Sequence, residues 1–273
     1  MDKMHNITKA YYKMFILDEL AEKRTAVHAV NPAAKLVVTL IFIITAVSYG
    51  KYDITGLLPL FIYPVVLMAA GDIPLKPILT GLVIAAPLVI GAGIFNPILD
   101  RTMITAAWGL AISSGMLSFI SLIIKCMLTV MAALLLVATT GMGNIAAAMQ
   151  KLHIPDIFIM QLLLTYRYIS VLLGETARVY NAYTLRAPNQ NGIGRRVWGS
   201  LPGLLLLRTF ERASRLYQAM KLRGYGERYF GAGIKRINRE DMLYLSGWTV
   251  FFITARIIDI PMFLGKLVTR FLI

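Results

Sequence analysis

The stretch MLSFISLIIKCMLTVMAALLLVAT, residues 116–139, decides the fold class of this chain. It is longer than the roughly 20 apolar residues that an α-helix needs to cross a bilayer, and its one charged residue is Lys125. We therefore expect a transmembrane helix that either begins outside the hydrocarbon or tilts. Lys125 either snorkels to the outer interface or makes a polar contact inside a helix bundle.

Composition extends this conclusion to the whole chain. Hydrophobic residues make up 58% of 273 positions, charged residues make up 15%, and the mean hydropathy is +0.67. Soluble domains have about 45 to 50% apolar and about 25% charged residues, so these values indicate an integral membrane protein. The lone cysteine, Cys126, excludes an internal disulfide and a thiolate cluster for a structural metal.

Further apolar stretches predict an all-α, polytopic helical membrane protein with about five transmembrane helices. They cover residues 34–49, 54–70, 78–95 and 243–260. The first follows Asn31-Pro32, where asparagine is a good N-terminal cap and proline fits the first helical position. The third contains Pro87 and several glycines, which predict a kinked and closely packed helix.

Basic residues gather in the segment that separates the fourth span from the last. Between Lys151 and Arg239, fifteen Lys or Arg stand against four Asp or Glu, in a chain of net charge +14. Such an excess of positive charge marks the cytoplasmic side of a membrane protein, so the N-terminus is also expected there. The expected regions are a cytoplasmic segment 1–33, a four-span region 34–140, a cytoplasmic coupling region 141–239, and a C-terminal helix and tail 240–273. The tail at 262–273 lies either outside or along the interface.

Two long helices are expected within the basic segment, in the cytoplasm or at the membrane interface. The first begins at Pro155-Asp156, with an acid favourable to the helix dipole, and no helix breaker follows before Pro188. The second begins near Ser200 and ends at Gly224, where a left-handed cap would form. Its apolar and basic residues fall on different faces, so this helix is expected to be amphipathic.

Both helices end in a similar tripeptide, Leu185-Arg186-Ala187 in the first and Leu222-Arg223-Gly224 in the second. One interpretation is that each arginine bonds the last free carbonyls of its helix and complements the dipole. The other is that both tips fit matching sockets on a partner protein. A guanidinium suits that task because its planar fork binds carboxylates at two points. The repetition of Leu-Arg before a small residue favours the second interpretation.

The sequence contains no recognisable pattern for catalysis or for metal or cofactor binding. The phosphate-binding pattern G-x-x-x-x-G-K-[ST] is absent, so the sequence gives no sign that this chain hydrolyses ATP. His5, His28 and His153 lie far apart, and neither they nor Cys126 form a ligand-spaced group. A polytopic lipid-modifying enzyme, the alternative from another class, would need clustered acids or histidines, whereas the aspartates here lie at the ends of different spans.

Several of these features together resemble the transmembrane T component of energy-coupling factor transporters, over about Asp18 to Trp248. The features are Asn31-Pro32-x-x-Lys35, Thr139-Thr140, the helix led by Pro155, Tyr166-Arg167-Tyr168 and the two arginine tripeptides. In that family the tripeptides are typically Ala-Arg-Gly and end coupling helices that dock on two ATP-binding-cassette ATPases. Here leucine precedes each arginine, and Ala187 replaces the glycine of the first motif.

The resemblance implies a non-catalytic subunit in a bacterial or archaeal cell membrane. Its partners would be two ATPases and a metal-binding membrane subunit, the S component, packed on the small-residue spans; nucleic acid is not among them. The branch resembled serves cobalt uptake for cobalamin biosynthesis, with nickel, biotin or another vitamin as alternative substrates. An ordinary two-fold ABC permease, with one coupling helix per subunit, is a further alternative. Motion of the two tips would involve the glycine-rich third span and the loop at Asn189 to Gly194 as two-state elements.

Overall fold

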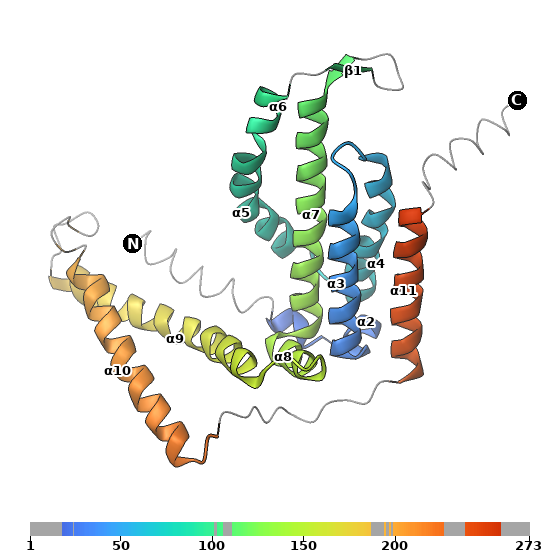
Figure 1. Ribbon diagram of the computed structural model, residues 1–273. Helices are drawn as coiled ribbons and strands as arrows, with labels where there is room; N and C mark the ends of the chain where they lie inside the picture. Colours follow the sequence, from blue (N-terminus) through green and yellow to red (C-terminus); the bar gives the residue numbers. More distant parts are fainter. Residues whose placement is uncertain are drawn as a thin grey trace, which may run out of the picture. The chain divides into compact units, whose positions relative to one another are not determined.

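The chain forms two compact units in the computed structural model, which is drawn in Figure 1. We call the first the bundle unit; it comprises residues 16–148 and 234–273. The second, which we call the hairpin unit, comprises residues 1–15 and 149–233. The residues that the structure describes are 18–23, 25–100, 103–105, 111–186, 194, 197, 199–226 and 238–257.

Helices make up almost all of the bundle unit. In chain order they are α2 (Ala26–Ala29), α3 (Pro32–Ser48), the 3-10 helix η1 (Thr55–Phe61), α4 (Ile62–Gly71), α5 (Leu75–Gly93), α6 (Phe95–Leu99), α7 (Ser114–Thr140) and α11 (Arg239–Ile257). The predicted helical class is confirmed. The described residues also include two short antiparallel strands, β1 (Met103–Thr105) and β2 (Ala111–Ser113). They lie in the connection between α6 and α7, where no strand was predicted.

Two long helices dominate the hairpin unit. Helix α8 (Met142–Lys151) carries the chain out of the bundle unit, and α9 (Asp156–Arg186) and α10 (Ser200–Leu222) follow. The predicted start of the first long helix at Pro155-Asp156 and its end at Arg186 are confirmed. The loop Asn189 to Gly194, named above as a two-state element, lies outside the described residues except for its last glycine.

Three helices in the described part of the chain are long and apolar enough to cross a membrane, namely Leu75–Pro97, Ser114–Thr140 and Asp156–Arg186. Pro32–Ser48 and Thr55–Gly71 are shorter apolar helices. Helix α9 therefore meets the length and composition of a span, although the sequence analysis assigned it to the cytoplasm or the interface. The predicted last span, 243–260, corresponds to α11, whose described part ends at Ile257.

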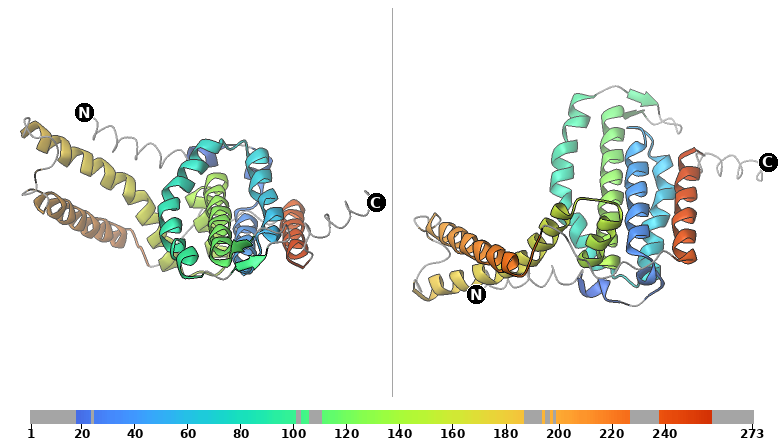
Figure 2. Two further views of the ribbon diagram at one scale, coloured as in Figure 1. Left: turned by 90° about the horizontal axis from the view of Figure 1, so that it is seen from above. Right: turned by 60° about the horizontal axis from the view of Figure 1, so that its bottom comes forward.

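An aromatic cluster holds α11 against α3 and α4 in the bundle unit. The ring of Tyr63 lies 4.7 Å from that of Phe42 and 4.9 Å from that of Trp248. Phe252 completes the cluster, 5.3 Å from both Phe42 and Tyr63. Tilted and edge-on rings at these distances attract each other beyond the area they bury. Figure 2 shows the resulting arrangement, with α3, α4, α7 and α11 side by side.

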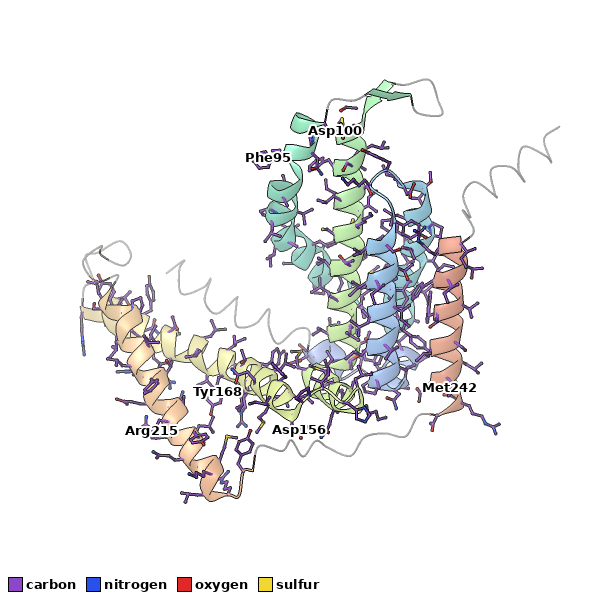
Figure 3. All side chains as sticks on the ribbon, viewed as in Figure 1. Phe95, Asp100, Asp156, Tyr168, Arg215 and Met242 are labelled. Atoms are coloured by element: carbon purple, nitrogen blue, oxygen red, sulfur yellow. The ribbon has the colours of Figure 1, made fainter. Side chains whose placement is uncertain are left out.

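Helix α5 packs closely on α7, as its glycines predicted. A Cβ atom on Gly81 would lie 2.5 Å from Leu134, and one on Gly93 would lie 2.6 Å from Phe119. Small residues of this kind let two helices approach in a membrane, where no hydrophobic effect drives their association. The other face of α5 is exposed, and Leu88 on it is 79% exposed. Figure 3 shows Phe95, at the start of α6, pointing away from α7.

Single residues decide local features of the first two apolar stretches. The cap at Asn31 is confirmed, because its side chain accepts a hydrogen bond from the Ala33 N–H at 3.1 Å, with Pro32 in the first turn. The second stretch, predicted as a span over 54–70, is helical over Thr55–Gly71. Its first part, which contains Pro59 with no N–H to donate, is a 3-10 helix that continues into α4.

Candidate functional site

Helices α9 and α10 form an antiparallel hairpin. Arg208, in the first half of α10, pairs with Glu175, in the second half of α9, at 2.6 Å. At the other end, Tyr217 and Tyr225 line the same groove as Ile157, near the start of α9. The two arginine tripeptides therefore lie at opposite ends of the hairpin, and the structure does not bring them together.

The end of α10 closes with a glycine cap, as predicted. Gly224 has a φ of 80°, in the left-handed region that glycine adopts without strain. The Tyr225 N–H donates to the Met220 carbonyl at 3.0 Å, and the Gly224 N–H donates to the Lys221 carbonyl at 3.0 Å. These two bonds make a Schellman motif, in which backbone N–H groups satisfy carbonyls at the helix end.

This cap bears on the role of Arg223. The Arg223 N–H itself donates to the carbonyls of Ala219 and Met220, so backbone groups already satisfy the last turn. The Arg223 side chain is exposed and forms no ion pair with a described residue. A capping role for the guanidinium is therefore not needed, which favours a role in binding a partner.

The tip of α9 has the same exposed character. Leu185 is 83% exposed and Leu222 is 90% exposed, although each is a large apolar side chain at the end of a long helix. Arg186 is also exposed, and it forms no ion pair with a described residue. Ala187 lies outside the described residues. Both leucines thus offer apolar surface beside an exposed positive charge, the composition of a contact site.

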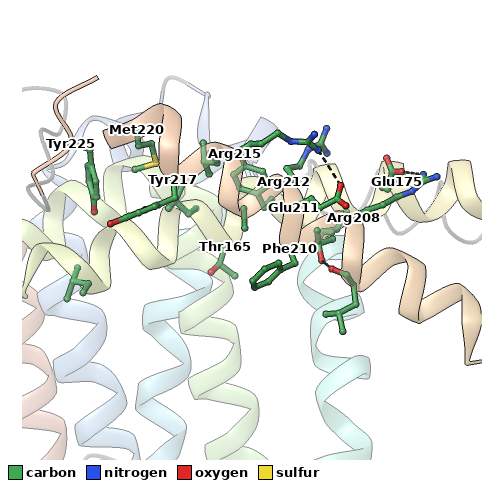
Figure 4. Close-up of a pocket in the computed structure, with 18 residues that line it drawn as sticks. Thr165, Glu175, Arg208, Phe210, Glu211, Arg212, Arg215, Tyr217, Met220 and Tyr225 are labelled. Atoms are coloured by element: carbon green, nitrogen blue, oxygen red, sulfur yellow. Dashed lines mark hydrogen bonds and ion pairs between the residues drawn. The ribbon is translucent and has the colours of Figure 1, made fainter. Parts of the chain in front are cut away.

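A groove of about 860 Å³ runs between the two helices, and Figure 4 shows it in close-up. Its apolar lining comes from both helices: Ile157, Leu164, Tyr168, Leu172, Phe210, Leu216, Tyr217 and Met220. No residue of α10 is buried, although the helix carries many leucines. A solvated helix with this much uncovered apolar surface normally has a partner or a membrane against it.

A buried polar network at one end of the bundle unit was missed by the sequence analysis. The Asp241 carboxylate accepts from the Asn31 N–H at 2.7 Å and from the Asn238 N–H at 2.8 Å. The Lys35 ammonium donates to the Thr139 carbonyl at 2.7 Å. Lys35 and Asp241 are only 3% and 6% exposed. The network joins the starts of α3 and α11 to the end of α7.

Sequence patterns that point to this network do exist. Asn31 and Lys35 belong to the Asn-Pro-x-x-Lys pattern, and Thr139 belongs to the threonine pair quoted above. Asn238-x-x-Asp241 is a capping-box pattern, in which an acid three residues into the helix bonds the N–H of the cap residue. That Asp241 also reaches Asn31, far away in the sequence, follows only from the packing.

The second interpretation of Lys125 fits the structure. Its ammonium donates to the carbonyls of Tyr49 and Gly50, at 2.5 Å and 3.0 Å. These carbonyls follow the end of α3, where backbone acceptors lack helical partners and the helix dipole favours a cation. Lys125 therefore joins α7 to the end of α3.

Two of the three histidines and the cysteine lie in the described part of the chain. Among the described residues, no group of three or more His, Cys, Asp or Glu is placed to hold a metal ion. His28 bonds to the Thr25 hydroxyl at 2.8 Å and to the Leu20 carbonyl at 3.0 Å. Burial, and then the nearby Lys35, lower the pKa of His28, which keeps the ring neutral near pH 7. His5 lies outside the described residues.

Comparison with known proteins gives consistent matches. The profile of the family described as "CbiQ: Cobalt transport protein" matches residues 23–230. The chain is 28% identical to the energy-coupling factor transporter transmembrane protein EcfT of Ruminiclostridium cellulolyticum, over 83% of this chain and 90% of that protein. It is 29% identical to the putative fused cobalt transport protein CbiMQ of Methanocorpusculum labreanum, over 68% of this chain and 33% of that protein. It is 32% identical to the nickel permease LarQ of Lactiplantibacillus plantarum, over 40% of each.

Proposed function

This chain belongs to the CbiQ family of cobalt transport proteins and is the T component of an energy-coupling factor transporter, and we propose that it couples two ATPases to cobalt uptake. It is a multi-pass membrane protein and a non-catalytic component of the transporter. The proposal adds the contact residues, the partners and the transported ion. The alternatives of a lipid-modifying enzyme and of an ordinary two-fold permease are set aside with the family.

The observation that carries the proposal is the pair of exposed Leu-Arg tips at opposite ends of one helical hairpin. Each tip presents an exposed apolar side chain and an exposed guanidinium that forms no ion pair with a described residue, Leu185 with Arg186 and Leu222 with Arg223. Two separate tips of the same chemistry suit two copies of the same kind of partner. The proposed contact residues at the tips are Leu185, Arg186, Ala187, Leu222, Arg223 and Gly224.

The proposed mechanism is mechanical. ATP binding closes two ATPases on each other, and each carries one tip with it, so that the angle between α9 and α10 changes. The apolar groove between the helices then changes shape. We assign that groove to the substrate-binding membrane subunit, because its apolar and aromatic lining matches the surface of a membrane helix. The small-residue spans were first considered for this contact, but two glycines of the third span, Gly81 and Gly93, already pack against α7.

Cobalt is the proposed substrate, and nickel is the second candidate. The proposal of cobalt is based on the family description and on the name of the fused relative CbiMQ. The proposal of nickel is based on the similarity to the nickel permease LarQ, which covers a smaller part of the chain. The resemblance described in the sequence analysis is the basis for considering a vitamin substrate and a role in cobalamin biosynthesis. The partner subunit, which binds the ion, would decide among these.

The proposed orientation places the N-terminus and the hairpin unit on the cytoplasmic side of the cell membrane. Its basis is the excess of Lys and Arg between residues 151 and 239. The ATPases are then on the side where ATP is available. A cysteine introduced at Ser200 should react with an impermeant maleimide only after the cell is broken.

Isolation of the intact complex tests the proposed function. An affinity tag on this chain should recover one copy of it, two ATPase subunits and a separate small membrane protein from solubilised membranes. Vesicles that contain this complex should take up radioactive cobalt when ATP is supplied on the cytoplasmic side. Recovery of the chain without an ATPase, or with lipid-modifying activity, would contradict the proposal.

The isolated chain is expected to bind neither cobalt nor nickel tightly and to hydrolyse no ATP. A tight transition-metal site needs several converging donors, and none is assembled among the described residues. Single Ala replacements of His5, His28, His153 and Cys126 should leave uptake by the whole complex near normal. Titration calorimetry of the purified chain is the measurement. A stoichiometric micromolar metal site that one of these replacements removes would mean that this chain selects the ion itself.

A further inference from the structure

One carboxylate links the two long helices of the hairpin unit. Glu175 of α9 accepts from the Arg208 guanidinium of α10 at 2.6 Å, the one ion pair between these helices among their described residues. Its second oxygen lies 2.8 Å from the guanidinium of Arg178, one turn further along α9. The Glu175 side chain is only 16% exposed. Charge-assisted bonds at such distances are shorter and stronger than neutral ones.

The excess of positive charge on α9 and α10 explains why an acid is needed between them. Helices α9 and α10 carry seven Lys or Arg and three Asp or Glu. The positive charges of the two helices repel each other across the hairpin. Asp156 lies in the first turn of α9, and Glu211 pairs with Arg215 inside α10 at 3.9 Å. Glu175 is therefore the acid that offsets this repulsion at the point where the helices meet.

The link also lies between the two tips. Glu175 precedes Arg186 by eleven residues, about 16 Å at 1.5 Å per helical residue. Arg208 precedes Arg223 by fifteen residues, about 22 Å in the opposite direction. A change in the angle between α9 and α10 at the Glu175–Arg208 pair therefore moves both tips at once.

We propose that Glu175 is a positioning residue, which sets the angle between α9 and α10 through Arg208 and so converts movement of one tip into movement of the other. Arg178 holds the second oxygen of the carboxylate and keeps it aimed at α10. This inference rests on the proposed coupling function. Without the link, each tip still binds its ATPase, but the hairpin opens loosely and ATP hydrolysis is no longer matched to transport.

Exchanging the charges of Glu175 and Arg208 distinguishes this positioning role from a general effect on the stability of the hairpin unit. Glu175→Arg places a third guanidinium between Arg178 and Arg208, whereas Glu175→Arg combined with Arg208→Glu restores an opposite pair in reversed order. The cobalt ions transported per ATP hydrolysed by the purified complex should fall by about tenfold in the single variant and recover in the exchanged pair. Recovery of both ATPases with the chain should stay normal in each variant.

A distance measurement gives a second readout that does not depend on transport. Cys126 is the one cysteine, so a Cys126→Ser chain accepts spin labels at Ala182→Cys on α9 and Ser214→Cys on α10, both exposed positions. In the complex reconstituted in lipid nanodiscs, the label–label distance distribution should broaden with Glu175→Arg and narrow again in the exchanged pair. The milder variant Glu175→Gln, which keeps the shape of the side chain, should broaden it less.

Glu211→Arg is the matched control for the distance measurement. It makes the same change of charge on α10, but it breaks an exposed pair within one helix. Because Glu211 also lines the groove, this variant adds positive charge there but leaves the Glu175–Arg208 pair intact, so the distribution should broaden clearly less than with Glu175→Arg. An unchanged distribution with Glu175→Arg, or a broad one that Arg208→Glu does not narrow, would overturn the positioning role. If the distances behave as expected but no variant and no wild-type complex transports cobalt, the proposed function fails and the link stands.

Discussion

Replacing Arg186 and Arg223 together by glutamate is expected to abolish recovery of both ATPases with the membrane subunits. Both guanidinium groups are exposed and free of ion pairs with described residues, so each is available to a partner. If an acidic or carbonyl-lined groove receives each one, glutamate presents an unpaired negative charge to that groove. Loss of one partner of a buried interfacial charge pair costs about 2 to 5 kcal/mol, so two losses weaken assembly by several orders of magnitude.

Pull-down through a tag on this chain, followed by quantification of the ATPase subunits, measures the effect. Each single variant should lose part of the ATPase, because one tip remains. Arg239→Glu is the matched control, since Arg239 is also exposed and basic but begins α11 and ends no coupling helix. Normal recovery of both ATPases and unchanged transport in the double variant would refute the coupling assignment.

Replacement of both leucines should give a weaker version of the same result. Leu185 and Leu222 lie beside the arginines and are almost fully exposed, so their burial in a complex would contribute apolar area. The tips were recognisable from the sequence because Leu-Arg before a small residue occurs at the expected ends of both long helices. That repetition does not depend on how α9 and α10 pack.

Local patterns predicted the helix ends well where one residue decides them. Asn31 caps α3, and Gly224 ends α10 with a left-handed φ, because each acts on backbone groups within a few residues of itself. The second span is also helical, but the 3-10 geometry of its first part was overlooked, although Pro59, which lacks an N–H, lies inside it. Apolar length alone placed α7 correctly. It does not decide whether α9 crosses the membrane or lies in the cytoplasm or at the interface.

The sites that depend on packing could not be predicted in the same way. The groove requires the crossing of α9 and α10, which no periodicity in either helix specifies. The bond from Asn31 to Asp241 joins residues 210 positions apart, and the sequence analysis treated Asp241 as one scattered acid among several. Glu175 likewise stood out only as a charge on α9 until the structure placed Arg208 beside it.

Asp241→Ala, in the polar network of the bundle unit, is expected to destabilise that unit strongly. The carboxylate accepts one N–H from the cap residue of α11, Asn238, and another from Asn31 at the start of α3. Hydrogen bonds to charged groups contribute about 1.5 to 3 kcal/mol each, and a buried N–H left without an acceptor costs its desolvation as well. The expected loss is therefore about 3 to 5 kcal/mol in the free energy of unfolding.

Thermal unfolding in detergent of the chain with Trp108→Phe and Trp198→Phe, followed by the fluorescence of the remaining Trp248 in the adjacent aromatic cluster, measures this loss. Glu240→Ala is the matched control, because Glu240 is also an acid in the first turn of α11 but is exposed, so it shares the dipole effect and lacks the buried bonds. Asp241→Asn should fall between them, since its amide oxygen can accept one of the two N–H groups but its NH₂ cannot accept the other. If Asp241→Ala and Glu240→Ala lower the unfolding temperature equally, helix dipole alone accounts for both acids. The bond to Asn31 would then contribute nothing to holding α11 against α3, and that contact would depend on the aromatic cluster and on the bond from the Tyr49 hydroxyl to the Ala255 carbonyl.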